Sequence, residues 1–157
     1  MQVAARPANR EDLPVLLTLY RALEAEMTAI HPMWPLADGL PEPVEDAFEQ
    51  ALADESNFLY VGTIDDVPLG LLLARIEDLL SQAKGLQIGA IRLVFVEMDA
   101  REVGVGEAMR DLAMSDLRQH GITRFDAHVL PGHRLVKNFF EAGGFSARTI
   151  VMHHADD

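Results

Sequence analysis

The feature that most constrains the fold is an apolar segment that passes through a glycine turn directly into an amphipathic stretch, between Leu93 and Leu117. The turn has the pattern Arg101-x-x-Gly104-x-Gly106. Glycine allows the backbone to turn sharply, and the first N–H groups of a helix have no partner within the helix, so an anion can approach them. The sequence therefore predicts a strand, a turn and a helix that together form an anion-binding site.

Two commoner phosphate-binding loops do not fit this turn. The dinucleotide-binding fingerprint needs a third small residue where Met109 stands, and the P-loop ends in Gly-Lys-Ser/Thr. Short glycine motifs also match by chance, so the turn alone leaves open that Gly104 and Gly106 only separate a strand from a helix. The segments that follow favour the anion site.

A second strand, turn and helix lie between Thr123 and Phe145, with a Pro-Gly turn in the middle and a Gly-Gly-Phe exit. This order of elements resembles the GNAT N-acetyltransferase superfamily. In that family a strand, an (Arg/Gln)-x-x-Gly-x-(Gly/Ala) turn and a helix hold the pyrophosphate of acetyl-CoA, and the second unit forms the other wall of the cofactor slot. The resemblance covers nearly the whole chain, beginning with residues 5–13, which look like the family's first strand and helix.

The resemblance implies a fold, a cosubstrate and a reaction. The fold is a mixed, mostly antiparallel α/β sheet of about seven strands with helices on both faces, and the length fits a single domain over residues 1–157. The reaction moves the acetyl group of acetyl-CoA to a primary amine of a small molecule or peptide by direct attack. Strand backbone would pair with the pantetheine arm like an added strand. The implied cofactor contacts are Val94, Val96, Met98, Arg101, Glu102, Val103, Gly104, Val105, Gly106, Glu107, His133 and Phe140.

Two positions depart from the family's pattern. His133 stands where many members carry an asparagine that bonds the pantetheine arm, and imidazole can donate or accept a hydrogen bond in the same place. Phe140 stands where many members carry a tyrosine whose hydroxyl protonates the departing thiolate. Since phenylalanine has no proton to give, the resemblance assigns the general-acid step to no residue of this chain.

Acetyl transfer to an amine also needs a base, because an alkyl ammonium has a pKa of about 10.4 and is protonated at neutral pH. Glu97 is the first candidate, since it ends the strand that would deliver the thioester; otherwise it is a solvated strand-end carboxylate. His128 is the second, since its strand borders the slot; otherwise it is a sheet residue. The backbone N–H of Val96 or Met98 is expected to stabilise the developing oxyanion.

Hydrophobic periodicity and turn residues predict the remaining elements. Asp65 and Asp66 predict a tight turn between two strands, and Asn9 is expected to cap a helix that ends near Met27. The other expected helices span 44–53, 104–120 and 134–142, and the expected strands span 3–6, 57–64, 67–76, 90–97, 125–130 and 145–154, with a polar connection at 77–87.

An aromatic and methionine cluster follows the first predicted helix, formed by Tyr20, His31, Met33 and Trp34. It can line an acceptor pocket or pack in the core. An exposed Trp34 would favour the pocket and a buried one the core.

Composition limits the partners. The absence of cysteine excludes disulfides, thiolate zinc sites and a cysteine nucleophile. A net charge of −12 opposes binding to nucleic acid or an anionic membrane and mildly favours a cationic substrate, although surplus acid often serves only solubility. His31, His153 and His154 form no convincing metal spacing, so no metal is expected. The chain lacks a signal-peptide pattern, so we expect a cytoplasmic protein; a homodimer stays open.

Two other functions compete with catalysis by an acetyltransferase. Phe140 and the lack of an obvious base favour a catalytically weak CoA-binding sensor or protein-interaction module on the same fold. An enzyme or binder that uses a longer acyl group is the third reading, and the sequence does not identify the acceptor.

Overall fold

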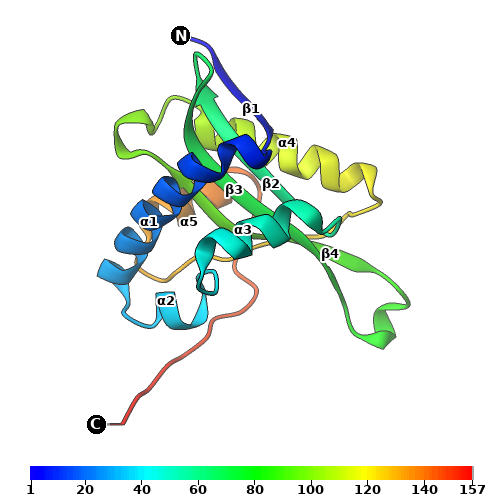
Figure 1. The fold of residues 1–157 in the computed structure, drawn as a ribbon. Helices are drawn as coiled ribbons and strands as arrows, with labels where there is room; N and C mark the ends of the chain where they lie inside the picture. Colours follow the sequence, from blue (N-terminus) through cyan, green and yellow to red (C-terminus); the bar gives the residue numbers. More distant parts are fainter. Residues whose placement is uncertain (157) are drawn as a thin grey trace.

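Five strands form one sheet in the order β1-β2-β3-β4-β5 in the computed structural model, which describes residues 1–156 (Figure 1). Strands β1 to β4 pair antiparallel with their neighbours, and β5 pairs parallel with β4. This confirms the mixed, mostly antiparallel α/β sheet. The strands are β1 (Val3–Pro7), β2 (Asn57–Ile64), β3 (Val67–Asp78), β4 (Gln87–Val96) and β5 (Phe125–Ala127).

The β2–β3 hairpin follows from its turn residues. Asp65 and Asp66 both have positive φ, 49° and 66°, which suits a two-residue hairpin turn whose twist matches the flanking strands. The Asp65 carboxylate also accepts a hydrogen bond from the backbone N–H of Gln2, 2.7 Å away, and so ties the turn to the beginning of β1. The predicted hairpin is confirmed.

The first long helix begins with a cap that the sequence predicted. The Asn9 side chain accepts a hydrogen bond from the Glu11 N–H, and the Asp12 carboxylate accepts one from the Asn9 N–H as part of a capping box. This cap starts a short 3-10 turn, Arg10–Asp12, and the helix α1 (Leu13–Ile30) follows directly. It therefore extends past the predicted end at Met27.

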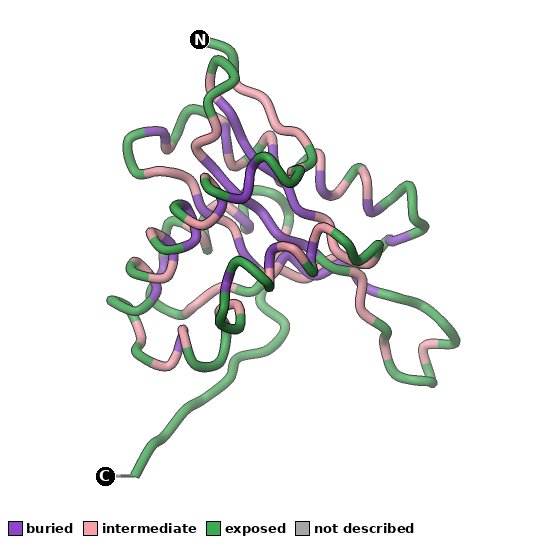
Figure 2. The backbone as a smooth tube through the Cα atoms, viewed as in Figure 1, coloured by how far each residue is buried: buried purple, intermediate pink, exposed green. Residues whose placement is uncertain are grey.

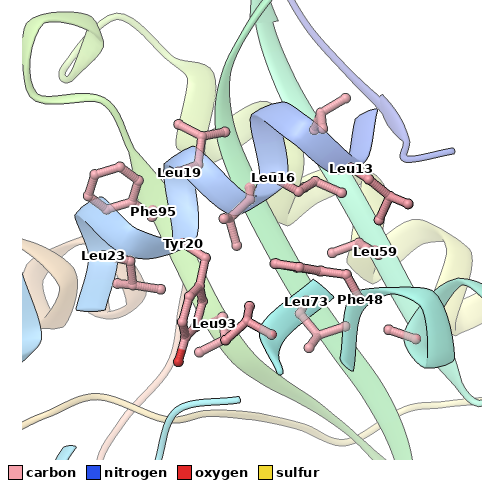
Figure 3. Close-up of a cluster of buried hydrophobic side chains, with 14 of the residues drawn as sticks. Leu13, Leu16, Leu19, Tyr20, Leu23, Phe48, Leu59, Leu73, Leu93 and Phe95 are labelled. Carbon is pink, nitrogen blue, oxygen red and sulfur yellow. The ribbon is translucent and has the colours of Figure 1, made fainter. Parts of the chain in front are cut away.

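Helices α1 and α3 (Val44–Ala53) cover one face of the sheet with an apolar core (Figure 3). The α1 side chains lie over the strands and meet Phe48 of α3, because leucines and Tyr20 recur at helical spacing. This first core contains Leu13, Leu16, Leu19, Tyr20, Leu23, Phe48, Leu59, Leu73, Leu93 and Phe95.

Helix α4 (Val105–Gln119) packs a second core on the opposite face. Two strand glycines let it approach closely: a β-carbon added at Gly62 would lie 2.5 Å from Cγ1 of Val105, and one at Gly70 would lie 2.8 Å from Cε of Met109. Figure 2 shows the buried strands between the two helical layers. Helices on both faces of the sheet are thus confirmed.

The C-terminal segment corrects the predicted strand count. Residues 146–156 form no strand and are exposed, and they run away from the body of the molecule in Figures 1 and 2. A strand needs a partner edge, and this segment meets β5 only through a side-chain ion pair between Arg148 and Asp126. The predicted strand at 145–154 is therefore wrong, and the described sheet has five strands rather than about seven.

Two smaller differences concern connections. Strands β3 and β4 continue as a hairpin to the pair Asp78 and Gln87, so the connection spans residues 79–86 and is shorter at both ends than the predicted 77–87. A short helix, α2 (Trp34–Ala37), lies in the proline-rich region predicted to be irregular. Trp34 is 7% exposed and Tyr20 is fully buried, so these two rings pack in the core, whereas His31 and Met33 of the same cluster are half-buried.

Candidate functional site

A gap opens where β5 leaves β4. The two strands pair only from Gly89 to Ile91 of β4, and the last backbone bond between them runs from the N–H of His128 to the carbonyl of Ile91. At this point β4 contains a bulge, because Leu73 and Ala74 of β3 face Leu93 and Ile91, which leaves Arg92 as an extra residue. A bulge bends and twists its strand, so β5 cannot follow β4 beyond it.

Beyond the bulge, β4 presents an edge that pairs with no strand of residues 1–156. The N–H of Glu97 bonds to the carbonyl of Leu69 in β3, 2.8 Å away. Since backbone direction alternates along an antiparallel pair, the N–H and C=O groups of Val94 and Val96 point to the opposite side, into the gap. The predicted pairing with an extended ligand therefore has a suitable edge at these two residues.

The N-terminus of α4 has backbone N–H groups without helical partners. Its N-cap residue is Gly104, with φ 102°, and no side chain within residues 1–156 caps it. The first helical bond runs from Ala108 to the Gly104 carbonyl, so the N–H groups of Val105, Gly106 and Glu107 have no partner within the helix. Glu102 also has a positive φ of 67°, which shapes the preceding loop.

The two motif glycines have different structural reasons. An added β-carbon at Gly104 would meet only Val3 Cγ1, at 3.9 Å, so its backbone conformation is what favours glycine. An added β-carbon at Gly106 would lie 3.1 Å from the ring of Phe139 in α5 (Arg134–Ala142). Gly106 therefore allows α4 and α5 to approach each other.

Arg101 is not a free cation in this structure. Its Nε–H donates to the Val96 carbonyl at 2.8 Å, and Nη2 donates to Oε1 of Glu26 at 2.7 Å. Its guanidinium also lies over the ring of Phe95, 5.3 Å from the centroid. The residue predicted to add positive charge near the anion is thus bonded to the end of β4 and to α1.

His133 is buried at the start of α5. Its side chain is the N-cap of that helix, with Nδ1 accepting the N–H of Val136 at 3.2 Å. With Nδ1 an acceptor, Nε2 carries the proton and donates it to Oε2 of Glu26 at 2.8 Å. Both ring nitrogens are therefore already engaged, although the sequence predicted a contact between His133 and the pantetheine arm.

Glu26 is the polar residue of this region that the sequence did not single out. Burial favours its neutral form, but the hydrogen bonds from His133 and Arg101 outweigh burial and hold the pKa of this carboxyl below its ordinary value. In the sequence it looks like any polar position of an amphipathic helix, next to buried Met27. Only the fold brings it to two residues that lie far along the chain.

His128, the second candidate for the base, lies beside the gap. Desolvation by the surrounding chain, followed by the positive charge of Arg92, lowers the pKa of its imidazole from the ordinary value. Both residues line a cavity of about 30 Å³ between β4 and the chain after β5, together with Val94. A cavity of this size accommodates a water molecule with polar partners.

The structure separates Glu97 from Phe140. Glu97 follows the last residue of β4 and is half-buried. The continuing strand alternation puts it on the face of Phe95, which is the α1 side. Phe140 is 2% exposed and packs between Phe139 and Phe145, so its ring belongs to the second core.

The described residues also set limits on other sites. Among residues 1–156, no three His, Asp or Glu side chains come together in a way that could hold a metal ion. Over the same residues, no helix has the length and apolar character needed to cross a membrane.

Solved structures share this fold at low sequence identity. The BH1408 protein of Bacillus halodurans, solved as a tetramutant, has a TM-score of 0.81 and 16% identity, with 99% of each chain covered. A GCN5-related N-acetyltransferase from Ralstonia eutropha has a TM-score of 0.74 and 20% identity, with 98% of this chain and 99% of that chain covered. The aminoglycoside acetyltransferase AAC(6')-Iy, in complex with the bisubstrate analog CoA-S-monomethyl-acetylneamine, has a TM-score of 0.75 and 17% identity, with 100% and 99% covered.

Sequence comparison identifies the family itself. No curated protein is similar enough in sequence to be counted as a relative. The model of the acetyltransferase (GNAT) family matches residues 18–145, which is most of the chain and includes the glycine turn and both strands of the gap. The protein therefore belongs to the GNAT acetyltransferase family.

Proposed function

We propose that the protein transfers the acetyl group of acetyl-CoA to a primary amine. One observation carries this proposal: the free edge of β4 beyond the Arg92 bulge lies next to the uncapped N-terminus of α4. An extended amide-bearing arm can pair with the first, and a pyrophosphate can accept hydrogen bonds from the second. Both apolar cores share the one sheet, which supports a single domain.

The pyrophosphate would be held by backbone rather than by side-chain charge. The N–H groups of Val105, Gly106 and Glu107 have no partner within the helix and lie at the positive end of its dipole, whereas Arg101 is engaged elsewhere. The pantetheine amides would bond Val94 and the N–H of Val96, because the Val96 carbonyl already accepts Arg101. In this arrangement Met98 and Val103 contribute backbone and loop shape.

The reaction would proceed by direct attack. The amine nitrogen forms a bond to the thioester carbonyl carbon, the C–S bond breaks, and CoA leaves as a thiolate that takes up a proton. Glu97 or His128 accepts the proton that the ammonium must lose, either directly or through a water in the small cavity. His128 is neutral at physiological pH because its pKa is lowered from the ordinary value, and Glu97 follows β4 on the α1 side.

A small cationic amine is the acceptor that the available observations favour. The chain carries a net charge of −12, which raises the local concentration of cations. One structural neighbour is an aminoglycoside acetyltransferase, although at 17% identity the likeness extends only to the fold. A peptide amine is the second acceptor class.

Turnover with a panel of amines tests the proposal. Release of CoA thiol from acetyl-CoA should depend on both an amine and the protein, and mass spectrometry should find the acetyl group on the amine nitrogen. An absence of transfer to every polyamine, aminoglycoside and peptide amine tested, in a protein that binds CoA, would contradict it.

A CoA-binding sensor is the second candidate. It is favoured by Phe140, which lies in the core and offers no proton to a departing thiolate. For a sensor, CoA should raise the melting temperature while no amine supports thiol release. A melting shift accompanied by turnover would instead support the transferase.

A further inference from the structure

One carboxylate connects the two loops that flank the proposed acetyl-CoA site. Glu26, near the end of α1, bonds Arg101 with Oε1 at 2.7 Å and His133 with Oε2 at 2.8 Å. Arg101 opens the loop that leads into α4, and His133 is the N-cap of α5. The end of α1 lies beside α5 in Figure 1, in agreement with the His133 contact.

These contacts differ from an ordinary surface ion pair. The side chains of Glu26 and Arg101 are only 23% and 22% exposed, and that of His133 is 8% exposed. Each partner also has a second bond to one wall of the proposed acetyl-CoA site. Arg101 bonds the carbonyl of Val96 in β4, which is the first wall, and His133 bonds the N–H of Val136 in α5, which is the second. Movement of either wall would therefore break bonds to the same carboxylate.

The cluster also has no spare positive charge. The carboxylate of Glu26 balances the guanidinium of Arg101, and His133 is neutral because its Nδ1 accepts a hydrogen bond. Its contribution to CoA binding must then come from geometry rather than from attraction for phosphate.

We propose that Glu26 is a positioning residue that holds the loops before α4 and α5 at the separation an acetyl-CoA molecule requires. This inference rests on the proposed function for its ligand, but its structural part concerns the free protein. Through Arg101 it also stabilises the loop that contains Glu102, whose positive φ is unfavourable for a residue with a side chain. Preorganised N–H groups bind an anion more tightly because less ordering is needed on binding.

The direction in which one substitution changes the affinity for CoA distinguishes positioning from simple electrostatics. Glu26→Gln removes a negative charge near an anionic cofactor, so electrostatics alone predicts tighter CoA binding. Positioning predicts weaker binding, because Arg101 and His133 donate to different oxygens of Glu26 and glutamine has an NH2 group in place of one of them, so one donor loses its acceptor. We expect the Kd for CoA, measured by calorimetry, to rise by about tenfold, in keeping with the loss of a charge-assisted hydrogen bond.

Glu24→Gln is the matched control. Glu24 lies on the same helix, its side chain is 25% exposed, and it also pairs with an arginine, Arg21, but it touches neither wall. This control should bind CoA within about twofold of the wild type. In turnover, Glu26→Gln should raise the KM for acetyl-CoA and leave the KM for the amine unchanged. CoA binding by Glu26→Gln that equals or exceeds that of the wild type would overturn the proposal.

A second variant keeps the test decisive if Glu26→Gln unfolds. His133→Asn preserves a good helix cap for α5 but is too short to reach Glu26. It should also weaken CoA binding, and the double variant Glu26→Gln/His133→Asn should bind no more weakly than Glu26→Gln alone. Effects that simply multiply would show that the two residues act independently and would overturn the link.

Hydrogen exchange distinguishes failure of this inference from failure of the proposed function. Without CoA, the amides from Glu102 to Glu107 should exchange faster in Glu26→Gln than in Glu24→Gln. Equal exchange in the two variants would overturn the positioning role, whatever the ligand. A wild-type protein that does not bind CoA at all would instead overturn the proposed function.

Discussion

Replacing Gly62 by alanine tests how closely α4 must approach the sheet. Without a steric conflict, Gly→Ala within a strand should stabilise the protein by about 0.5–1 kcal/mol, because alanine loses less backbone entropy on folding. In this fold the new methyl group would lie 2.5 Å from Cγ1 of Val105 and 3.0 Å from Cγ and Sδ of Met109. Val105 is buried in the first turn of the helix, so it has little room to move.

The expected result is a net destabilisation. Overpacking of this kind typically costs about 1–3 kcal/mol, which exceeds the entropic gain and reverses its sign. Urea unfolding followed by circular dichroism should therefore show a lower midpoint with an unchanged slope. CoA affinity should fall as well, because the added methyl group pushes on the residue that begins α4 and so displaces the N–H groups proposed to bind pyrophosphate.

A compensating substitution supplies the control. Val105→Ala removes the methyl group that would clash and costs about 2 kcal/mol by itself through lost apolar burial. The double variant Gly62→Ala/Val105→Ala should be destabilised by clearly less than the sum of the two single destabilisations, because the new methyl group fills space that Val105 vacates. Strict additivity, or a stabilised Gly62→Ala protein, would refute the close approach.

Three further predictions follow from single side chains. The Arg6 guanidinium hydrogen-bonds the Asp12 carboxyl and lowers its pKa, so the stability from this pair should be complete above about pH 4 and lost as pH falls through the lowered value; urea melts of Asp12→Asn should lack this acid-dependent loss. Phe140→Tyr should destabilise the protein by about 1–3 kcal/mol without raising turnover, because it buries a hydroxyl in the second core. A gain in rate would instead show that the side chain at position 140 reaches the departing thiolate. Glu97→Gln should cut turnover by about 10²-fold and flatten the acidic limb of the pH–rate profile if Glu97 is the base, whereas a silent variant transfers that role to His128.

Local signals in the sequence predicted much of the fold. The paired aspartates at 65–66 and the glycine turn at 101–106 both specify backbone conformations that few other residues adopt. The periodic helices 44–53 and 134–142 were placed correctly for the same reason, since their patterns are complete within a few turns. Each of these elements depends on residues that are neighbours in the chain.

Features that depend on distant partners could not be predicted in this way. Residues 145–154 are rich in strand-forming side chains, but they pair with no strand of the described chain. The role of Arg101 was predicted from its motif, whereas its contacts depend on Glu26, which is 75 residues away in sequence. The bulge at Arg92 could not be predicted from the apolar run that contains it, because it is defined by the pairing of β4 with β3.

Because of that bulge, the alternation of β4 side chains between the two faces of the sheet shifts by one residue at Arg92. Before Arg92, odd-numbered Ile91 belongs to the core under α4; after it, odd-numbered Leu93 belongs to the core under α1, and even-numbered Val94 turns to the α4 side. Deletion of Arg92 would restore a single alternation along β4, leave the downstream side chains on the faces that they now occupy, and remove the bend that keeps β5 away. An alignment of this strand with other sequences is therefore meaningful only if it allows a one-residue shift at position 92.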